Sequence, residues 1–418
     1  MKIIVKVLEY VDSLTKSPLY RNSAYILLSS VVNGFLGFSF WVIAARFYSQ
    51  GQVGVATAVI SLMAITIAFS RLGLDQSLIR FFPSGDKKLI LSTSILMVTS
   101  LSVTFAVVTL LFIDYLSPEL AFLRSNAVIY LVLLAGGSAT LITSNALLAA
   151  RNAKNYFVQN LITNLRIIFV VLLISLGTIG IIGSYAGAFA IAVLYSIIIL
   201  RNAGIKLSMK IDFKYLRNSI AYSAGNYFTS FLSDLPLQII PIIIIGILGP
   251  NDSALYYVSY VLVMFILAIP NAFSTSLLVE GSHGENLHQA IVKSIVGSYT
   301  LVIPAILALI VLAPTLLGML GTEYLGAIDL LDLMLLSTPF MVLTSIYSSV
   351  LRVQKKMGSL IVLAAIVASI MLSTGYVFLL SFGLLGVAYA WILGNAVGSC
   401  FILFVISRGR IKQPSVSV

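Results

Sequence analysis

Two charged side chains lie inside otherwise apolar stretches of this sequence. Asp234 lies in the stretch 218–249, and Arg166 lies in the stretch 157–177. An ionised group at the centre of a bilayer costs roughly 2.5 to 3.5 kcal/mol, so such a residue is expected to face a cavity or a partner rather than lipid. If these stretches cross a membrane, the two residues are the first candidates for function.

A stripe of polar side chains accompanies Asp234. Its members are Tyr222, Asn226, Tyr227, Ser230 and Gln238. Tyr227, Ser230 and Gln238 share one helix face with Asp234. Because lipid would penalise each of them, we predict that the stripe lines a cavity and binds substrate. Three roles stay open for Asp234: it could bind a coupling ion, carry a proton, or pair with Arg166.

Two prolines follow Asp234 in the same stretch. Pro236 and Pro241 each lack a backbone N–H and clash with the preceding helical turn. In a membrane, the carbonyls freed in this way must find partners in the protein or in a water-filled cavity. We therefore predict that the two prolines form a hinge.

Arg166 lies about nine residues inside its apolar stretch, ~14 Å from the nearer end. We predict that it binds a phosphate group of the substrate. The alternatives are a structural partner in the same part of the protein, or snorkelling toward the nearer face. Arg46, Arg71 and Arg80 lie at the expected ends of the first two spans and could bind an anionic head group too, although interface anchoring is the commoner role.

The composition is that of a membrane protein. Of the 418 residues, 60% are hydrophobic and 9% are charged, which excludes a soluble globular domain. We predict an all-α polytopic membrane protein with twelve transmembrane helices. They are expected at residues 22–45, 51–70, 88–113, 126–150, 157–177, 180–200, 218–249, 253–279, 290–313, 328–351, 358–380 and 383–407.

The basic residues predict the orientation of these spans. With both termini in the cytoplasm, all but three of the 25 Lys and Arg fall in the terminal segments or the inner loops. The exceptions are Arg46, Arg124 and Arg166. This positive-inside pattern predicts a multi-pass protein of the cell (cytoplasmic) membrane. The net charge of +11 therefore reflects topology and anionic membrane lipids, and we expect no nucleic acid partner.

The two halves of the chain resemble each other. Thr143-Ser144 recurs as Thr344-Ser345, and the motif at 180–183 recurs at 383–386. Copies of six spans each have the same orientation in the membrane. We predict an N-terminal six-helix lobe at 1–200, a basic cytoplasmic linker at 201–217 and a C-terminal six-helix lobe at 218–418, arranged around a central cavity.

Other classes of activity find little support. The longest expected outer loops, 114–125 and 314–327, are short for an enzyme acting outside the membrane. No GxxxxGK loop occurs, so ATP is not the direct energy source. His283 and His288 lack a surrounding set of cysteines or carboxylates, so we expect no metal site. We expect no cofactor and no enzymatic activity, which leaves transport driven by ion or substrate gradients.

A set of short motifs resembles the polysaccharide transporter family of lipid-linked oligosaccharide flippases. The segments are Ala44-Ala45-Arg46-Phe47-Tyr48, Gly51, Val53-Gly54, Ala56, Arg71 to Asp75 and Leu78 to Phe81, and Leu248-Gly249-Pro250 to Tyr257 looks like the first element repeated. The superfamily of these flippases also contains the multidrug and toxin extrusion (MATE) exporters and the peptidoglycan-precursor flippase. The resemblance covers nearly the whole chain and implies a MATE-like fold.

The resemblance also implies a function. The cargo would be a polyprenyl-(pyro)phosphate-linked oligosaccharide, moved from the inner to the outer leaflet by alternating access for cell-surface polysaccharide biosynthesis. Its partners would be membrane lipids and glycan polymerase or glycosyltransferase machinery, and we expect a monomer. The alternative is a cation-coupled multidrug exporter of the same superfamily, which would favour an acidic cavity.

Overall fold

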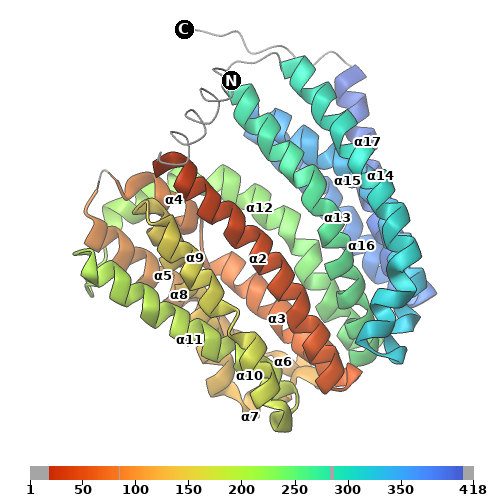
Figure 1. The fold of residues 1–418 in the computed structure, drawn as a ribbon, viewed down its shortest axis with the longest axis horizontal. Coiled ribbons are helices and arrows are strands. Elements are labelled where there is room, and N and C mark those ends of the chain that lie inside the picture. Colours follow the sequence, from red (N-terminus) through yellow and green to blue (C-terminus); the bar gives the residue numbers. More distant parts are fainter. Residues whose placement is uncertain (1–17, 84, 283–286, 408–418) are drawn as a thin grey trace, which may run out of the picture. The chain divides into compact units, whose positions relative to one another are not determined.

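The computed structural model describes residues 18–83, 85–282 and 287–407, and within these ranges the chain is helical with no strand. Twelve helical segments there are long and apolar enough to cross a membrane. The predicted all-α polytopic membrane protein with twelve spans is confirmed. Figure 1 shows the helices in chain order.

The first half of the chain contains the helices α2 to α11. Their bounds are α2 Pro18–Phe47, α3 Gln50–Ser70, α4 Leu74–Phe81, α5 Lys87–Leu111, α6 Ile113–Leu116, α7 Phe122–Ser125, α8 Ala127–Ala149, α9 Ala153–Thr163, α10 Arg166–Leu172 and α11 Thr178–Asn202. Short 3-10 turns lie at Pro118–Leu120 and Ile174–Leu176.

The second half contains the helices α12 to α17. Their bounds are α12 Phe213–Ile247, α13 Pro250–Ser282, α14 Leu287–Leu320, α15 Ile328–Val353, α16 Met357–Phe382 and α17 Leu385–Ser407, with a 3-10 turn at Thr322–Ala327. The helix that contains Asp234 thus begins at Phe213, about one turn before the expected start of its span.

The described chain forms two compact units. Unit 1 comprises residues 18–47, 66–113 and 122–224, and unit 2 comprises residues 48–65, 114–121 and 225–407. The inner loop expected between the lobes is ordered against unit 1, because Ser92 Oγ and Thr93 Oγ1 of α5 accept from the backbone N–H groups of Ser208 and Asp212, each at 2.8 Å. The lobe boundaries inferred from sequence stay a prediction.

The expected span 157–177 is two helices rather than one. α9 ends at Thr163 and α10 begins at Arg166, and Figure 1 draws them as separate pieces. Polar side chains at the break explain it: the carbonyl of Asn160 accepts from Thr163 Oγ1 at 2.7 Å and from Asn164 Nδ2 at 2.8 Å. Such side-chain bonds replace backbone bonds of a continuing helix. The predicted membrane span is present at Ala153–Leu172, and a turn at Asn164 and Leu165 interrupts its helix.

The internal repeat is visible in the backbone. Arg151 and Lys355 both adopt positive φ, 56° and 55°, in the turns that follow α8 and α15. Gly177 and Gly383 share a second unusual conformation, with φ of 57° and 60°. Their carbonyls accept from the N–H groups of Gly180 and Gly386. The structural counterparts of Arg151 and Gly180 are therefore Lys355 and Gly386, so the expected pairings of Thr143 with Thr344 and of Gly180 with Gly383 were each three residues out of register.

Candidate functional site

A cavity of about 410 Å³ lies inside unit 2. Helices α12, α13, α15 and α16 surround it, and Asn395 of α17 contributes as well. One wall is polar and comes from α12, α13 and α15. It comprises Thr229, Ser233, Asp234, Asn271, Ser274, Thr275, Thr344, Ser345, Ser348, Ser349 and Arg352. The wall contributed by α16 is apolar and comprises Leu360, Leu363, Ala364, Val367, Ala368 and Met371.

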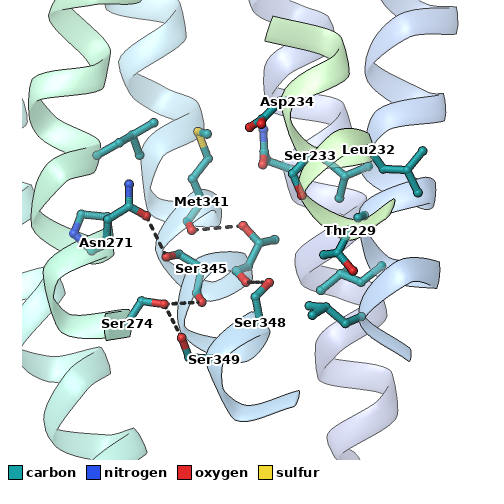
Figure 2. A pocket seen from close by; sticks show the side chains of 18 of the residues that line it. Thr229, Leu232, Ser233, Asp234, Asn271, Ser274, Met341, Ser345, Ser348 and Ser349 are labelled. Carbon is teal, nitrogen blue, oxygen red and sulfur yellow. Dashed lines mark hydrogen bonds between the residues drawn. The ribbon is translucent and has the colours of Figure 1, made fainter. Parts of the chain in front are cut away.

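Hydrogen bonds join the polar wall across two helices, as Figure 2 shows. Ser274 Oγ of α13 donates to the carbonyl of Ser345 at 2.8 Å and lies 2.6 Å from Ser349 Oγ of α15. Ser345 Oγ donates to Asn271 Oδ1 at 3.2 Å. These contacts fix α13 against α15 and hold the side chains of the wall in place.

Several hydroxyl groups of this wall donate their hydrogen bonds to the protein backbone. Thr229, Thr275, Thr344 and Ser348 each donate to a backbone carbonyl three or four residues earlier, at 2.7 to 3.0 Å. A hydroxyl carries one donor and two acceptor lone pairs, so a hydroxyl that has donated still presents an acceptor. The wall is therefore rich in hydrogen-bond acceptors, which favours a cationic or donor ligand over an anion.

The prolines add to this acceptor set. α12 is continuous through Pro236 and Pro241. Each proline lacks the N–H that would bond four residues back, which leaves the carbonyls of Leu232 and Leu237 without their helical donors. Leu232, Pro236 and Leu237 all line the cavity. In a membrane, carbonyls freed in this way are satisfied by protein groups or by water in such a cavity.

Asp234 is the one carboxylate among the residues lining the cavity. Its side chain is exposed, on the α12 turn that also carries Ser233 (Figure 2). Tyr260 of α13 lies close enough for an electrostatic interaction with Asp234. Arg352, one residue before the end of α15, also lines the cavity. The cavity thus holds one carboxylate and one guanidinium among neutral polar groups.

The other members of the predicted stripe lie elsewhere on α12. Asn226, Tyr227, Ser230 and Gln238 are not among the residues that line this cavity. Tyr227 is buried, and its ring stacks on Phe231 at 6.0 Å between centroids. The adjacent helix face, with Thr229, Ser233 and Leu237 at four-residue spacing, lines the cavity instead. Substrate binding by the stripe stays a prediction.

Sequence reasoning missed the serines of α13 and α15. The available signal was the density of hydroxyls in one apolar span, at Thr344, Ser345, Ser348 and Ser349. Residues spaced by four lie on one helix face, so Thr344 with Ser348 and Ser345 with Ser349 form two adjacent polar ridges. What the sequence could not supply is the partner ridge on α13, because contacts between distant segments depend on packing.

Arg166 is held by aromatic rings within unit 1. Its guanidinium carbon lies 4.5 Å from the ring centroid of Tyr185 and 5.3 Å from that of Phe40. Cation–π contacts of this kind contribute roughly 0.5 to 2 kcal/mol. One terminal nitrogen donates to Asn164 Oδ1 at 3.4 Å. The buried Nε has no hydrogen-bond partner among the described residues, so Arg166 keeps donor capacity.

A chain of amides surrounds this arginine. Asn164 Nδ2 donates to Asn33 Oδ1 at 2.6 Å, and Asn160 Nδ2 donates to Ser29 Oγ at 2.9 Å. These bonds tie α9 and the break after it to α2. The guanidinium is therefore positioned by two rings and an ordered amide, on a backbone where the helix is interrupted.

Three further arginines were predicted to contact substrate, and all belong to unit 1. Arg46 is exposed in the last turn of α2, and Arg80 is exposed in the last turn of α4. Arg71, in the turn before α4, lies 3.5 Å from Asp75. Their role in binding stays a prediction.

Asp75 is a buried carboxylate in the first turn of α4. Burial raises the pKa of Asp75 above its usual value, and the nearby Arg71 guanidinium and the N–H of Gln76 partly offset this. The pair is a structural element of the α3–α4 turn.

The two copies of the flippase-like motif meet in unit 2. Gly51 lies against Asn251, and Gly54 lies directly against the backbone carbonyl of Pro250. Ser253 Oγ donates to the carbonyl of Gly54 at 3.4 Å. A Cβ at position 54 would collide with the Pro250 carbonyl, so only glycine permits this approach of α3 to α13. The motif is thus explained by helix packing.

The titratable residues do not form a metal centre in the described part of the chain. No group of three or more His, Cys, Asp or Glu side chains there could hold a metal ion. His283, one of the two histidines considered from sequence, lies outside the described residues.

Comparisons with known proteins agree with this architecture. A family described as "Polysaccharide biosynthesis protein" matches residues 19–279. The solved structure "Lipid II flippase MurJ, inward closed conformation" is similar with a TM-score of 0.75 and 16% identity, over 91% of this chain and 87% of that chain. No curated protein sequence matches.

Two MATE structures are similar as well. An inward-facing MATE family transporter of the MOP superfamily has a TM-score of 0.72 and 16% identity, over 91% of this chain and 96% of that chain. An outward-facing one has a TM-score of 0.61 and 16% identity, over 95% and 96%. At these identities the likeness establishes the fold, and the expected MATE-like fold is confirmed.

Proposed function

Because the chain belongs to the polysaccharide biosynthesis protein family, we propose that it is a flippase for a polyprenyl-(pyro)phosphate-linked oligosaccharide. The family and the fold make it a membrane transporter of the flippase and MATE class. In the proposed cycle, the protein takes its cargo from the inner leaflet, releases it to the outer leaflet, and exposes its binding surface alternately to the two sides.

The observation that carries this proposal is Arg166. The guanidinium of Arg166, a permanent cation that is partly buried and held on Tyr185 and Phe40, is suited to bind a phosphate oxygen. No carboxylate of the described residues forms a salt bridge with it, so its positive charge is available. An anionic lipid-linked cargo fits a permanent cation of this kind better than a cationic drug does.

We also propose that Asp234 binds the coupling cation. The carboxylate borders a cavity whose wall presents hydroxyl lone pairs and carbonyls freed by prolines, and oxygen ligands of this kind suit Na⁺ or a proton-carrying water. Pro236 and Pro241 would act as the hinge that couples cation binding to the bending of α12. The sodium and pH dependence of transport separates the two ions.

A cation-coupled multidrug exporter is the second candidate. The MATE-like fold and Asp234 favour it, since such an exporter needs a carboxylate that exchanges a cation for its drug. Arg166 counts against it, because a fixed positive charge repels cationic drugs.

The decisive experiment is deletion of the gene, followed by an assay of which leaflet holds the lipid-linked sugar. Accumulation in the inner leaflet, restored by the intact gene, supports the flippase. Unchanged sugar distribution together with raised sensitivity to cationic drugs would instead identify the exporter.

A further inference from the structure

The segment 205–214, which joins α11 to α12, is an ordered strip with both ends fixed in unit 1. Ile205 and Tyr215 are buried in the same core cluster, together with residues of α4, α5 and α8. Between them, Ser92 Oγ and Thr93 Oγ1 accept backbone hydrogen bonds from Ser208 and Asp212. The path of this strip is therefore set by the fold of unit 1.

Despite this fixed backbone, the strip exposes large apolar side chains. Met209 is 87% exposed and Phe213 is 72% exposed, and Leu207 and Ile211 are exposed as well. Four apolar side chains exposed to water on a short, ordered strip forgo the favourable free energy of burying apolar surface. Among the described residues nothing covers these four side chains, so an apolar environment outside the described part of the chain is needed to explain them.

Lysines alternate with these apolar residues. Lys206, Lys210 and Lys214 are all exposed, and Lys87 and Lys88 are exposed at the start of α5 beside the strip. The nearby carboxylates are Asp86, which accepts from the backbone N–H groups of Lys88 and Leu89, and Asp212, which accepts from that of Tyr215. The five lysines outnumber them, so the net charge here is positive. The strip therefore combines positive charge with apolar surface.

The depth of the strip follows from its contact with α5. Ser92 and Thr93 lie about 8 Å along the helix axis from the first residue of α5. A strip bonded there runs beside the first turns of a membrane-spanning helix, which is the level of the lipid head groups. Apolar side chains with flanking lysines at this depth have the chemistry of an interfacial anchor.

We propose that the strip 205–214 binds the anionic lipid surface, with Met209 and Phe213 inserted below the phosphates and the three lysines bound to them. This anchor fixes unit 1 in the leaflet next to α12, the helix that carries Asp234. The proposal does not depend on the cargo, so its test is independent of transport.

The test uses the full-length protein in a Cys400→Ser background, with a nitroxide attached at Met209→Cys. The protein is reconstituted in phosphatidylcholine vesicles with or without phosphatidylglycerol. Collisions of the label with oxygen and with a neutral, water-soluble nickel chelate then report its depth. A label at Glu119→Cys, which is exposed in a polar turn, serves as the water-facing reference.

With phosphatidylglycerol, we expect the label at position 209 to collide mainly with oxygen. Replacing Lys206, Lys210 and Lys214 with glutamine should raise its collisions with nickel about fivefold or more, since each lysine near an anionic surface is worth roughly a factor of five. These side chains are exposed, so folding is retained and is checked by size exclusion. Nickel accessibility equal to that at position 119 in both vesicles, or no change in the glutamine variant, would overturn the proposal.

Discussion

At the scale of single residues, the charge of Arg166 and its ring contacts make separable contributions. Lysine keeps the positive charge but lacks the planar group that stacks on Tyr185 and reaches Asn164. Alanine removes both. The pair of substitutions therefore distinguishes binding by charge from binding by shape.

We expect Arg166→Ala to abolish transport and Arg166→Lys to keep part of it, because the proposed role is positive charge for a phosphate. Tyr185→Phe is the matched control, since it keeps the ring beneath the guanidinium and should transport nearly as the parent does. Transport is measured as the outer-leaflet fraction of the lipid-linked sugar. Full activity of both Arg166 variants would reduce Arg166 to a structural role.

Asp75 gives a pH-dependent prediction. Its folded-state pKa is raised above the ordinary 3.8, so its contribution to stability is complete below about pH 4 and is lost as the pH rises through the raised value. Asp75→Asn cannot ionise and lacks this loss. The thermal midpoint of the variant minus that of the parent, measured in detergent, should therefore increase from about pH 4 to pH 7. A difference that is constant with pH would contradict the assignment.

At the scale of helices, the close packing of α3 against the start of α13 depends on one glycine. Gly54 is needed because α3 touches the Pro250 backbone at the start of α13. Gly54→Ala should destabilise the protein by roughly 1 to 3 kcal/mol, since a backbone carbonyl cannot rotate away. Gly358→Ala, with no atom within 4 Å of the added Cβ, should not destabilise it. Thermal midpoints of the two variants test this, and an equal effect of both would refute it.

α12 should bend where its prolines lie, with Asp234 biasing the bend. Asp234→Asn should trap one access state, and Pro236→Ala with Pro241→Ala should slow switching while binding is retained. The measurement is cysteine accessibility at Asn226 and Gly246 from each side of the membrane, in a Cys400→Ser background. Parental labelling patterns with intact transport in both variants would make α12 a passive support.

The helices were largely predictable, and the exceptions have physical reasons. Apolar length alone identifies membrane spans, because lipid requires every backbone group to be bonded internally. It could not show the break at Asn164, where side chains compete for the carbonyl of Asn160. Nor could it distinguish which face of α12 borders the cavity, because Ser230 and Ser233 are equally polar and only the packing of α13 and α15 separates them.

At the scale of the whole molecule, the sequence carries the internal repeat and the charge asymmetry. The repeat was found from short motifs, but its register was shifted by three residues at both Thr143 and Gly180, because such short motifs recur by chance in a sequence rich in a few residue types. Backbone conformation corrects it, since Gly177 and Gly383 share an unusual φ and ψ. The ring contacts of Arg166 join three separate helices and had no signal in the sequence.

The last prediction concerns topology. An even number of spans places both termini on one side, and the positive-inside pattern makes that side the cytoplasm. α5 separates the linker at its start from Glu119 beyond its end, so the two should face opposite sides. In a Cys400→Ser background, an impermeant maleimide added to intact cells should label Glu119→Cys and not Lys210→Cys, with the reverse in inside-out vesicles.

The C-terminus gives a second test of the same topology, because a reporter fused after Val418 should be active only in the cytoplasm. Labelling of both cysteines from one side would refute the span count, and reversed labelling would refute the orientation.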